Sequence, residues 1–186
     1  LAEAFTLDRV SKAGAKFDPD KTKWFQQQYL RATTDQQLAE MLNKHTVNKY
    51  DLLTLTSIAS LMKERATFVE DMLTEGVYLL ERPTVYDEVT VSKKWKEGTS
   101  ELLNAFKSKL QSLENFNSAT IEECFKNFLE EKQLGVGAVL PLFRLVLTGT
   151  GMGPSMFDIT AFLGKEESII RIESGIHAIE SLVAKP

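Results

Sequence analysis

Apolar residues recur three or four positions apart along almost the whole of this chain, and no stretch alternates apolar and polar residues for the length of a strand. Within residues 50–65 the apolar positions are Leu52, Leu53, Leu55, Ile58, Leu61 and Met62. Because one helical turn takes 3.6 residues, this spacing gathers apolar side chains into a stripe that another helix must cover. We therefore predict an all-α protein made of two consecutive helical bundles.

Cap residues and helix breakers divide this pattern into separate helices. Asp18 before Pro19 predicts a helix over residues 17–32. Thr34, three residues before Gln37, predicts a capping box for the next, short helix. A further helix is expected over residues 50–65, with its start at Thr46 or Asn48. Another should run from a cap at Thr120 and Glu123 to the helix breakers Gly135 and Gly137. The other helices are expected over residues 67–80, 92–113, 139–147, 154–163 and 165–183.

The first predicted helix carries three aromatic residues, Trp24, Phe25 and Tyr29, at helical spacing on one side. Lysines and arginines line the rest of that helix. The aromatic side is therefore either a core stripe beside a solvated face or a surface presented to RNA. We expect it to be core, because large apolar side chains are more often buried than exposed.

A glycine-rich turn, TGTGMGP, joins the last two apolar stretches. Its glycines let the backbone turn where a Cβ atom would clash, and Pro154 is expected at the first position of the following helix. Free N–H groups at such a helix start attract a phosphate or a base acceptor, and Arg144 lies on the helix that leads in. The alternative is a tight turn with no ligand. The motifs of Rossmann and Walker nucleotide sites are absent, since no strand precedes the glycines and Gly164-Lys165 is followed by Glu166.

The net charge of −4 argues against a generally basic nucleic-acid binder but allows a local basic face. Lys93, Lys94 and Lys96 would lie in the first turn of the helix predicted over residues 92–113, where they oppose the helix dipole. They are either contacts to a phosphate backbone or a solvated run of charge. A single cysteine, no signal peptide and no long apolar run predict a cytoplasmic protein that does not enter a membrane.

No group of residues points to catalysis. His45 and His177 have no ligand partners at a suitable spacing, so no metal site is expected. Neighbouring acids such as Glu122 and Glu123 point apart on a helix, which is wrong for an acid–base pair. We therefore predict no catalytic residue and no bound cofactor in this chain.

Two longer segments are similar to one family. Residues 5–30, FTLDRVSKAGAKFDPDKTKWFQQQYL, resemble the segment that follows the catalytic half of bacterial glutamyl-tRNA synthetases. Residues 143–172, FRLVLTGTGMGPSMFDITAFLGKEESIIRI, look like the final region of that family, with its Arg-Leu-x-Leu-Thr-Gly run, its Gly-Pro before a helix and its Leu-Gly-Lys-Glu. The resemblance covers nearly the whole chain in the right order.

The resemblance implies the C-terminal, all-helical anticodon-binding region of a glutamate–tRNA ligase. Residues 1–32 would end the stem-contact region, residues 33–83 would form the first anticodon-binding subdomain, and residues 84–186 would form the second. The residue pattern also gives a boundary at Pro83, because the residue before a proline avoids the helical region and residues 84–90 lack helical periodicity. These seven residues are expected to be a linker.

The implied partner is a glutamate tRNA rather than DNA or a membrane, and the chain is expected to be monomeric. ATP and Mg would be bound by the catalytic half of the parent enzyme, so this piece should not attach glutamate to tRNA by itself. The alternative is a helical scaffold for protein–protein interaction with no RNA role.

The resemblance also assigns roles to particular residues. The anticodon-contacting residues of the family correspond to Arg65, Arg144, Gly153, Pro154 and Met156. The TGTGMGP turn is longer than in relatives. For Arg65 the residue pattern leaves an alternative, in which it caps its helix or pairs with Glu64 or Glu70.

Overall fold

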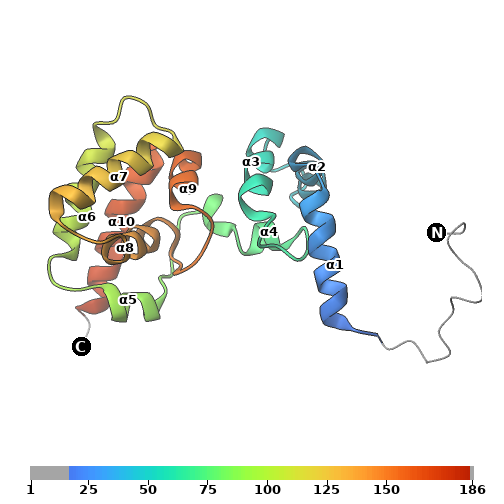
Figure 1. Cartoon of the computed structure of the whole chain (residues 1–186), viewed down its shortest axis with the longest axis horizontal. Helices are drawn as coiled ribbons and strands as arrows, with labels where there is room; N and C mark the ends of the chain where they lie inside the picture. Colours follow the sequence, from blue (N-terminus) through green and yellow to red (C-terminus); the bar gives the residue numbers. More distant parts are fainter. Residues whose placement is uncertain (1–16, 185–186) are drawn as a thin grey trace, which may run out of the picture.

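The computed structural model describes residues 17–184, and every regular element in that range is a helix. In chain order the elements are α1 (Pro19–Ala32), α2 (Asp35–His45), α3 (Leu52–Met62), α4 (Asp71–Thr74), η3 (Val77–Leu79), α5 (Glu88–Lys94), α6 (Thr99–Gln111), α7 (Ser118–Lys132), α8 (Val136–Thr148), α9 (Met156–Leu163) and α10 (Lys165–Val183). They form two bodies along the long axis of the molecule (Figure 1). The predicted all-α class with two consecutive bundles is confirmed.

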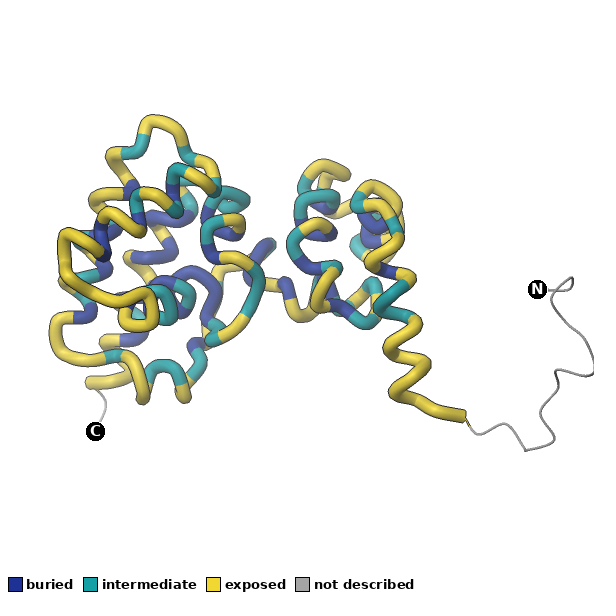
Figure 2. The backbone as a smooth tube through the Cα atoms, viewed as in Figure 1, coloured by how far each residue is buried: buried dark blue, intermediate teal, exposed yellow. Residues whose placement is uncertain are grey.

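The first bundle is built on α2 and α3, which lie side by side. Leu38 and Leu42 of α2 and Leu55 and Ile58 of α3 are fully buried. Burying each such side chain stabilises the fold by about 1.5–3 kcal/mol. Helix α1 extends beyond this bundle, and along most of its length it is exposed (Figure 2).

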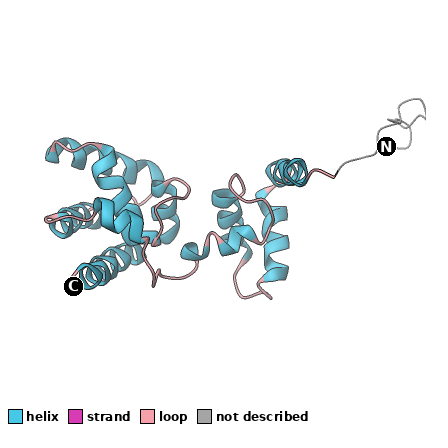
Figure 3. Ribbon diagram, turned by 90° about the horizontal axis from the view of Figure 1, so that it is seen from below, coloured by secondary structure: helices cyan, strands magenta, loops and turns pink. Residues whose placement is uncertain are grey.

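The second bundle is built around a cluster of phenylalanines. The ring of Phe106 lies 5.3 Å from Phe125, 5.2 Å from Phe128 and 5.0 Å from Phe143, measured between ring centroids. These residues come from α6, α7 and α8, so the cluster holds three helices together. Helix α10 lies against α6 and α8 and closes the bundle. Figure 3 shows the same two bodies from below, with α1 at the outer end of the first.

Several predicted helix ends are confirmed. The Asp18 carboxylate accepts hydrogen bonds from the backbone N–H groups of Asp20 and Lys21, both at 3.1 Å, and Pro19 begins α1. Thr34 and Gln37 form the predicted capping box of α2. Helix α10 has the predicted bounds, with Gly164 between it and α9.

The prediction that the aromatic side of α1 is core is wrong. Trp24 is 54% exposed, Phe25 46% and Tyr29 69%. Leu30 is the buried residue of this helix. No described element covers the aromatic side because α1 meets the first bundle only near its C-terminal end. The preceding residues 5–16, which belong to the first family-like segment, lie outside the described range.

The helix predicted over residues 50–65 is shorter than expected and starts later. Its N-cap is Asp51, whose carboxylate accepts a hydrogen bond from the backbone N–H of Thr54 at 2.9 Å. Val47 and Asn48 have positive φ angles, which end α2 instead of starting a new helix. Leu52 and Leu53, at the exposed start of α3, are not buried as the stripe predicted.

The helix predicted over residues 67–80 is also wrong, because the chain forms only the short α4 and η3 there. The Asp71 carboxylate accepts hydrogen bonds from the backbone N–H groups of Thr67 at 2.9 Å and Phe68 at 2.7 Å. These bonds favour a turn over a continuous helix. Phe68 and Val77, predicted to be buried, are exposed.

The long helix predicted over residues 92–113 is two helices. Helix α5 begins within the predicted linker and is capped by Asp87. Gly98, with a φ angle of +82°, interrupts the helical backbone before α6. Lys93 and Lys94 therefore lie in the last turn of α5, where the helix dipole favours positive charge instead of opposing it.

Three other boundaries are corrected. Asn117, not Thr120, caps α7. Gly137 lies inside α8 and does not interrupt the helix. Ser155 caps α9, so Pro154 precedes the helix and is not its first residue.

In α10, Ile170 is partly exposed although the stripe predicted it to face inward. No helix among residues 17–184 is long and apolar enough to cross a membrane.

A buried arginine joins the two bundles. Arg171 of α10 is only 2% exposed, and it donates hydrogen bonds to the backbone carbonyls of Tyr78 and Leu147. Its Nε donates to the Glu167 carboxylate at 2.7 Å. Arg82, in the segment between η3 and α5, donates to the same carboxylate from Nε at 2.9 Å and from Nη2 at 2.7 Å.

Gly175 is expected to be intolerant of a side chain. An added Cβ would lie 2.8 Å from the Val146 Cβ and 2.8 Å from its carbonyl oxygen, where α10 crosses α8. Gly175→Ala should lower the free energy of unfolding, because overpacking costs about 1–3 kcal/mol and outweighs a gain of up to about 1 kcal/mol in helix propensity. Gly137→Ala, with no atom within 4 Å of the added Cβ, should instead stabilise by about 0.5–1 kcal/mol. Urea denaturation measures both, and equal effects would contradict the close crossing.

The stability of the chain should depend on pH through Glu167. Its pKa is lowered from 4.5 to about 2, chiefly by the hydrogen bonds from Arg82, with Arg171 adding to the effect. A lowered pKa in the folded state means that the stabilisation is complete above pH 4.5 and is lost as the pH falls toward 2. The difference in unfolding free energy between wild type and Glu167→Gln should therefore be largest at neutral pH and shrink in acid. A difference that does not change with pH would show that Glu167 has no such role.

Candidate functional site

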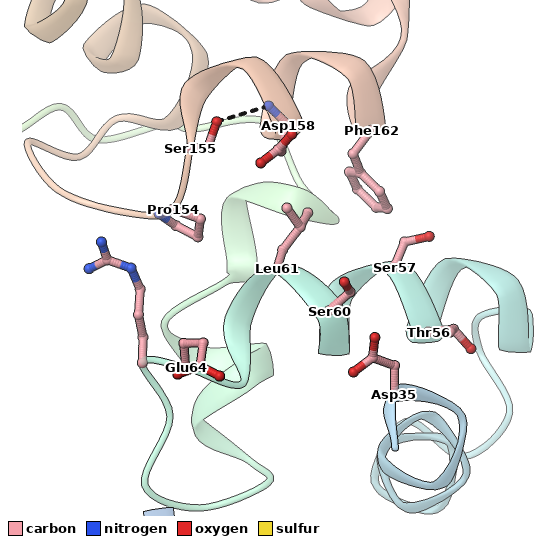
Figure 4. Close-up of a pocket in the computed structure, with 11 residues that line it drawn as sticks. Asp35, Thr56, Ser57, Ser60, Leu61, Glu64, Pro154, Ser155, Asp158 and Phe162 are labelled. Carbon is pink, nitrogen blue, oxygen red and sulfur yellow. Dashed lines mark hydrogen bonds between the residues drawn. The ribbon is translucent and has the colours of Figure 1, made fainter. Parts of the chain in front are cut away.

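A cleft of about 760 Å³ lies between the two bundles, with α3 on one side and the start of α9 on the other. Its lining residues are Asp35, Thr56, Ser57, Ser60, Leu61, Glu64, Arg65, Pro154, Ser155, Asp158 and Phe162. Figure 4 shows Pro154, Asp158 and Phe162 facing Leu61 and Ser57 across it. Hydroxyl groups and carboxylates make the wall polar, so the cleft suits a ligand that forms hydrogen bonds.

Arg65 lies just past the end of α3, where the chain turns away from the bundle. Its side chain is exposed and lines the cleft. The acids that could have paired with it have other partners, since Glu64 pairs with Arg31 at 3.0 Å and Glu70 with His45 at 3.3 Å. Within residues 17–184 its guanidinium has no ion pair or hydrogen bond. The alternative that it pairs with Glu64 or Glu70 is therefore wrong, and its donors face the cleft.

Arg144, on α8, is half-buried behind the glycine turn. Its Nη2 donates to the carbonyl of Pro154 at 2.7 Å. Its Nη1 is buried and has no hydrogen-bond partner among the described residues. A Cβ on Gly153 would lie 2.6 Å from that Nη1, so a side chain at position 153 would displace the Arg144 guanidinium. Burial lowers the pKa of Arg144, and the nearby charge of Arg65 lowers it further.

Tyr78, on η3, lies near both arginines and is not among the site residues predicted from the sequence. Its hydroxyl lies 3.6 Å from the Met62 sulfur and close to Gly153. Burial raises the pKa of Tyr78, while the charges of Arg144 and Arg65 act in the opposite direction. The structure therefore brings two arginines, one from each bundle, near one phenol. No local signal marks this tyrosine, because the residue pattern predicts that it lies within a helix over residues 67–80.

The glycine turn is held by the start of α5. The backbone N–H of Asp87 donates to the carbonyl of Gly149 at 2.8 Å, and a Cβ on Gly149 would lie 2.4 Å from the carbonyl oxygen of Val85. Gly149 also has a φ angle of +73°, which favours glycine. Met156 is only 2% exposed, so its side chain supports the core of the second bundle and does not face the cleft.

The predicted lysines lie elsewhere. Lys93, Lys94 and Lys96 are exposed at the end of α5 and in the loop after it. Lys94 donates to the carbonyl of Gly137 at 3.2 Å. No contact found between residues 17 and 184 joins these lysines to Arg65 or Arg144, so they form a separate basic patch.

The hydroxyl residues of the cleft were also missed. Thr56, Ser57 and Ser60 lie on the side of α3 away from its apolar stripe, and this placement is visible in the sequence. From the sequence alone, Ser155 could be predicted only as a helix cap. As a cap, it accepts a hydrogen bond from the backbone N–H of Asp158 at 3.4 Å. In the part of the chain that the structure describes, no three metal-binding side chains come together.

The chain is similar to known proteins over most of its length. A family model described as "Anticodon binding domain" matches residues 37–176. The glutamate–tRNA ligase of Christiangramia forsetii is 38% identical over 183 residues, and that of Flavobacterium johnsoniae is 43% identical over 182. The alignments cover 97% and 96% of this chain but 36% of each relative. The chain therefore spans about a third of the length of these curated relatives.

Solved structures give the same result. A crystal structure of a glutamate tRNA ligase from Elizabethkingia meningosepticum, in complex with its amino acid, matches with a TM-score of 0.85 at 34% identity. That match covers 93% of this chain and 35% of the other. The glutamate-tRNA synthetase of Elizabethkingia anophelis matches with a TM-score of 0.82 at 32% identity, covering 93% of this chain and 34% of that one.

The cluster of Arg65, Arg144 and Tyr78 can be tested without a ligand. Both arginines favour the ionised phenol, so removing one should raise the pKa of Tyr78 further. We expect this rise in Arg144→Gln, measured by NMR titration of labelled tyrosine. Arg31→Gln is the control, because Arg31 pairs with Glu64 instead. An unchanged Tyr78 titration in Arg144→Gln would contradict the cluster.

Proposed function

The chain belongs to the family of anticodon-binding domains and matches glutamate–tRNA ligases over nearly its whole length, and on this premise we propose that it binds the anticodon loop of a glutamate tRNA. The observation that carries the proposal is the cleft between the bundles, which Arg65 lines from one side and Pro154 from the other, with Arg144 bonded to the Pro154 carbonyl. Proteins read RNA sequence mainly in loops, where bases are unstacked and can enter such a cleft.

The chemistry of the cleft favours bases over phosphates. An arginine offers a planar fork of hydrogen-bond donors that suits the acceptors on a base edge. Glu64 and Asp158 line the same cleft and would repel a phosphate, whereas they can accept hydrogen bonds from base amino groups. With a net charge of −4, the chain has no general attraction for RNA. Recognition would therefore depend on this local arrangement.

We further propose that this chain supplies the anticodon-binding part of a longer glutamate–tRNA ligase. Attachment of glutamate, with ATP and Mg, would belong to the portion of such relatives that lies outside the aligned region. ATP–pyrophosphate exchange by this chain alone should be absent. Measured exchange would assign catalysis to this segment and contradict that division of labour.

Gel shift with tRNA transcripts tests the binding proposal. Glutamate tRNA should be shifted at low salt, and the affinity should fall as salt rises because phosphate contacts release counterions. A glutamine tRNA transcript should bind more weakly. Equal failure with every tRNA at low salt would favour the alternative of a helical protein–protein scaffold.

Arg65 is expected to discriminate between tRNAs. Glutamate and glutamine anticodons differ at their third base, which is C in one and G in the other. Arginine only donates hydrogen bonds, which suits the O2 and N3 acceptors of cytosine, while the pairing edge of guanine presents its own donors. Arg65→Gln can both donate and accept, so it should cost about 1–3 kcal/mol toward glutamate tRNA and narrow the gap to glutamine tRNA.

Lys44→Gln is the matched control for this change, because Lys44 is also an exposed cation of the first bundle but does not line the cleft. The ratio of its affinities for glutamate tRNA and glutamine tRNA should equal that of wild type. The same ratio in Arg65→Gln as in wild type would remove the assignment of Arg65 as the discriminating residue.

The lysine patch should contribute affinity without preference. Changing Lys93, Lys94 and Lys96 together to Gln should weaken binding to both transcripts equally and reduce the salt dependence, because phosphate contacts position an RNA and base contacts specify it. Filter binding over a salt series measures both effects. If affinity at low salt stays at the wild-type value, the lysines are a solvated face.

A further inference from the structure

Arg171 connects two backbone segments that carry the candidate site. One is η3, where the Tyr78 carbonyl accepts a hydrogen bond from Nη1. The other is the last turn of α8, where the Leu147 carbonyl accepts a hydrogen bond from the same Nη1 at 3.1 Å. Arg144 lies one turn earlier on α8. A single buried guanidinium therefore fixes the spacing between Tyr78 and the helix that carries Arg144.

Glu167 extends this connection to the segment between the bundles. Its carboxylate accepts hydrogen bonds from Arg171 at 2.7 Å and from Arg82 at 2.9 and 2.7 Å. The Arg82 contact uses two nitrogens, which gives it a defined geometry as well as charge. Arg82 lies where the chain passes from the first bundle to the second. This contact should therefore restrain the angle between the bundles.

None of these three residues lines the cleft. Arg65 lines the cleft from the first bundle, and Arg144 of the second bundle donates to the carbonyl of Pro154, which lines the other side. The distance between the two arginines thus depends on how the bundles are held, and the described contacts that hold them include this network. A displacement of about 1 Å is enough to weaken a site whose groups must act together.

We propose that Arg82, Glu167 and Arg171 form an interbundle clamp, and that they act as positioning residues which set the spacing of Arg65 and Arg144 for reading a base. The clamp itself follows from the contacts above. Its consequence for RNA rests on the proposed function.

The clamp can be tested without RNA by measuring the distance between the bundles. Spin labels on Leu53→Cys of α3 and Glu130→Cys of α7, in a Cys124→Ser background, report it by pulsed electron resonance. Leu53 and Glu130 are exposed and lie on opposite bundles. Arg82→Ala should broaden or shift the distance distribution. Arg82 is 52% exposed, so its removal should leave each bundle folded.

Glu173→Ala is the matched control. Glu173 is also exposed and pairs through one ion pair, with Lys107 at 2.8 Å, but this pair joins α10 to α6 within the second bundle. Its distance distribution should equal that of wild type. If Arg82→Ala gives the same distribution as Glu173→Ala, the clamp does not exist.

The consequence for RNA is tested by the ratio of affinities for glutamate and glutamine tRNA transcripts. Arg82→Ala should lower this ratio several-fold without changing the salt dependence of binding, and Glu173→Ala should not. Combining Arg82→Ala with Arg65→Gln should give little further loss, because both act on the same contact. Additive losses would overturn the positioning role. If wild type binds neither transcript, the proposed function fails, and the distance distributions alone decide whether the clamp exists.

Discussion

The buried guanidinium of Arg171 is the interaction on which the arrangement of this protein depends. A charge removed from water costs several kcal/mol unless it is paired and hydrogen-bonded. Here Glu167 supplies the opposite charge, and the carbonyls of Tyr78 and Leu147 accept hydrogen bonds from the same guanidinium. Leu147 lies in the last turn of α8, where helix carbonyls lack partners within the helix. One side chain thus satisfies a helix end and ties it to the first bundle.

The candidate site is a product of that junction and not of either bundle alone. Arg65 comes from the end of α3, Arg144 from α8, and Tyr78 from the short η3 at the end of the first bundle. Two positive groups lie near one buried phenol, and the surrounding structure holds them there although their charges repel each other. Glycine at position 153 permits this approach because any Cβ would meet the Arg144 guanidinium. The buried Nη1 of Arg144 has no hydrogen-bond partner among the described residues, so the cluster retains an unsatisfied donor.

The sequence predicted helix positions correctly where the apolar spacing and the cap residues agreed. Helix α10 was placed correctly because its apolar stripe runs unbroken from a glycine, and α2 because a complete capping box marks its start. It failed over residues 67–80, where Asp71 binds backbone N–H groups outside the helix, and at Gly98, which divides an otherwise periodic stretch. The aromatic side of α1 shows the limit of periodicity, since spacing predicts a stripe but not what covers it.

The sequence by itself determined the all-α class, most of the core positions and the likeness to anticodon-binding regions, because helical spacing and short motifs are local properties of the chain. It also identified Arg65, Arg144, Gly153 and Pro154 as residues of interest. Only the tertiary structure decided that Arg65 and Pro154 line one cleft, that Arg144 bonds to the Pro154 carbonyl, that Tyr78 lies near both arginines, and that Met156 and the lysine patch do not line the cleft. The physical reason is that the site lies between two bundles. Its geometry depends on contacts between residues up to 93 positions apart, such as Arg171 with Tyr78, and no local pattern encodes them.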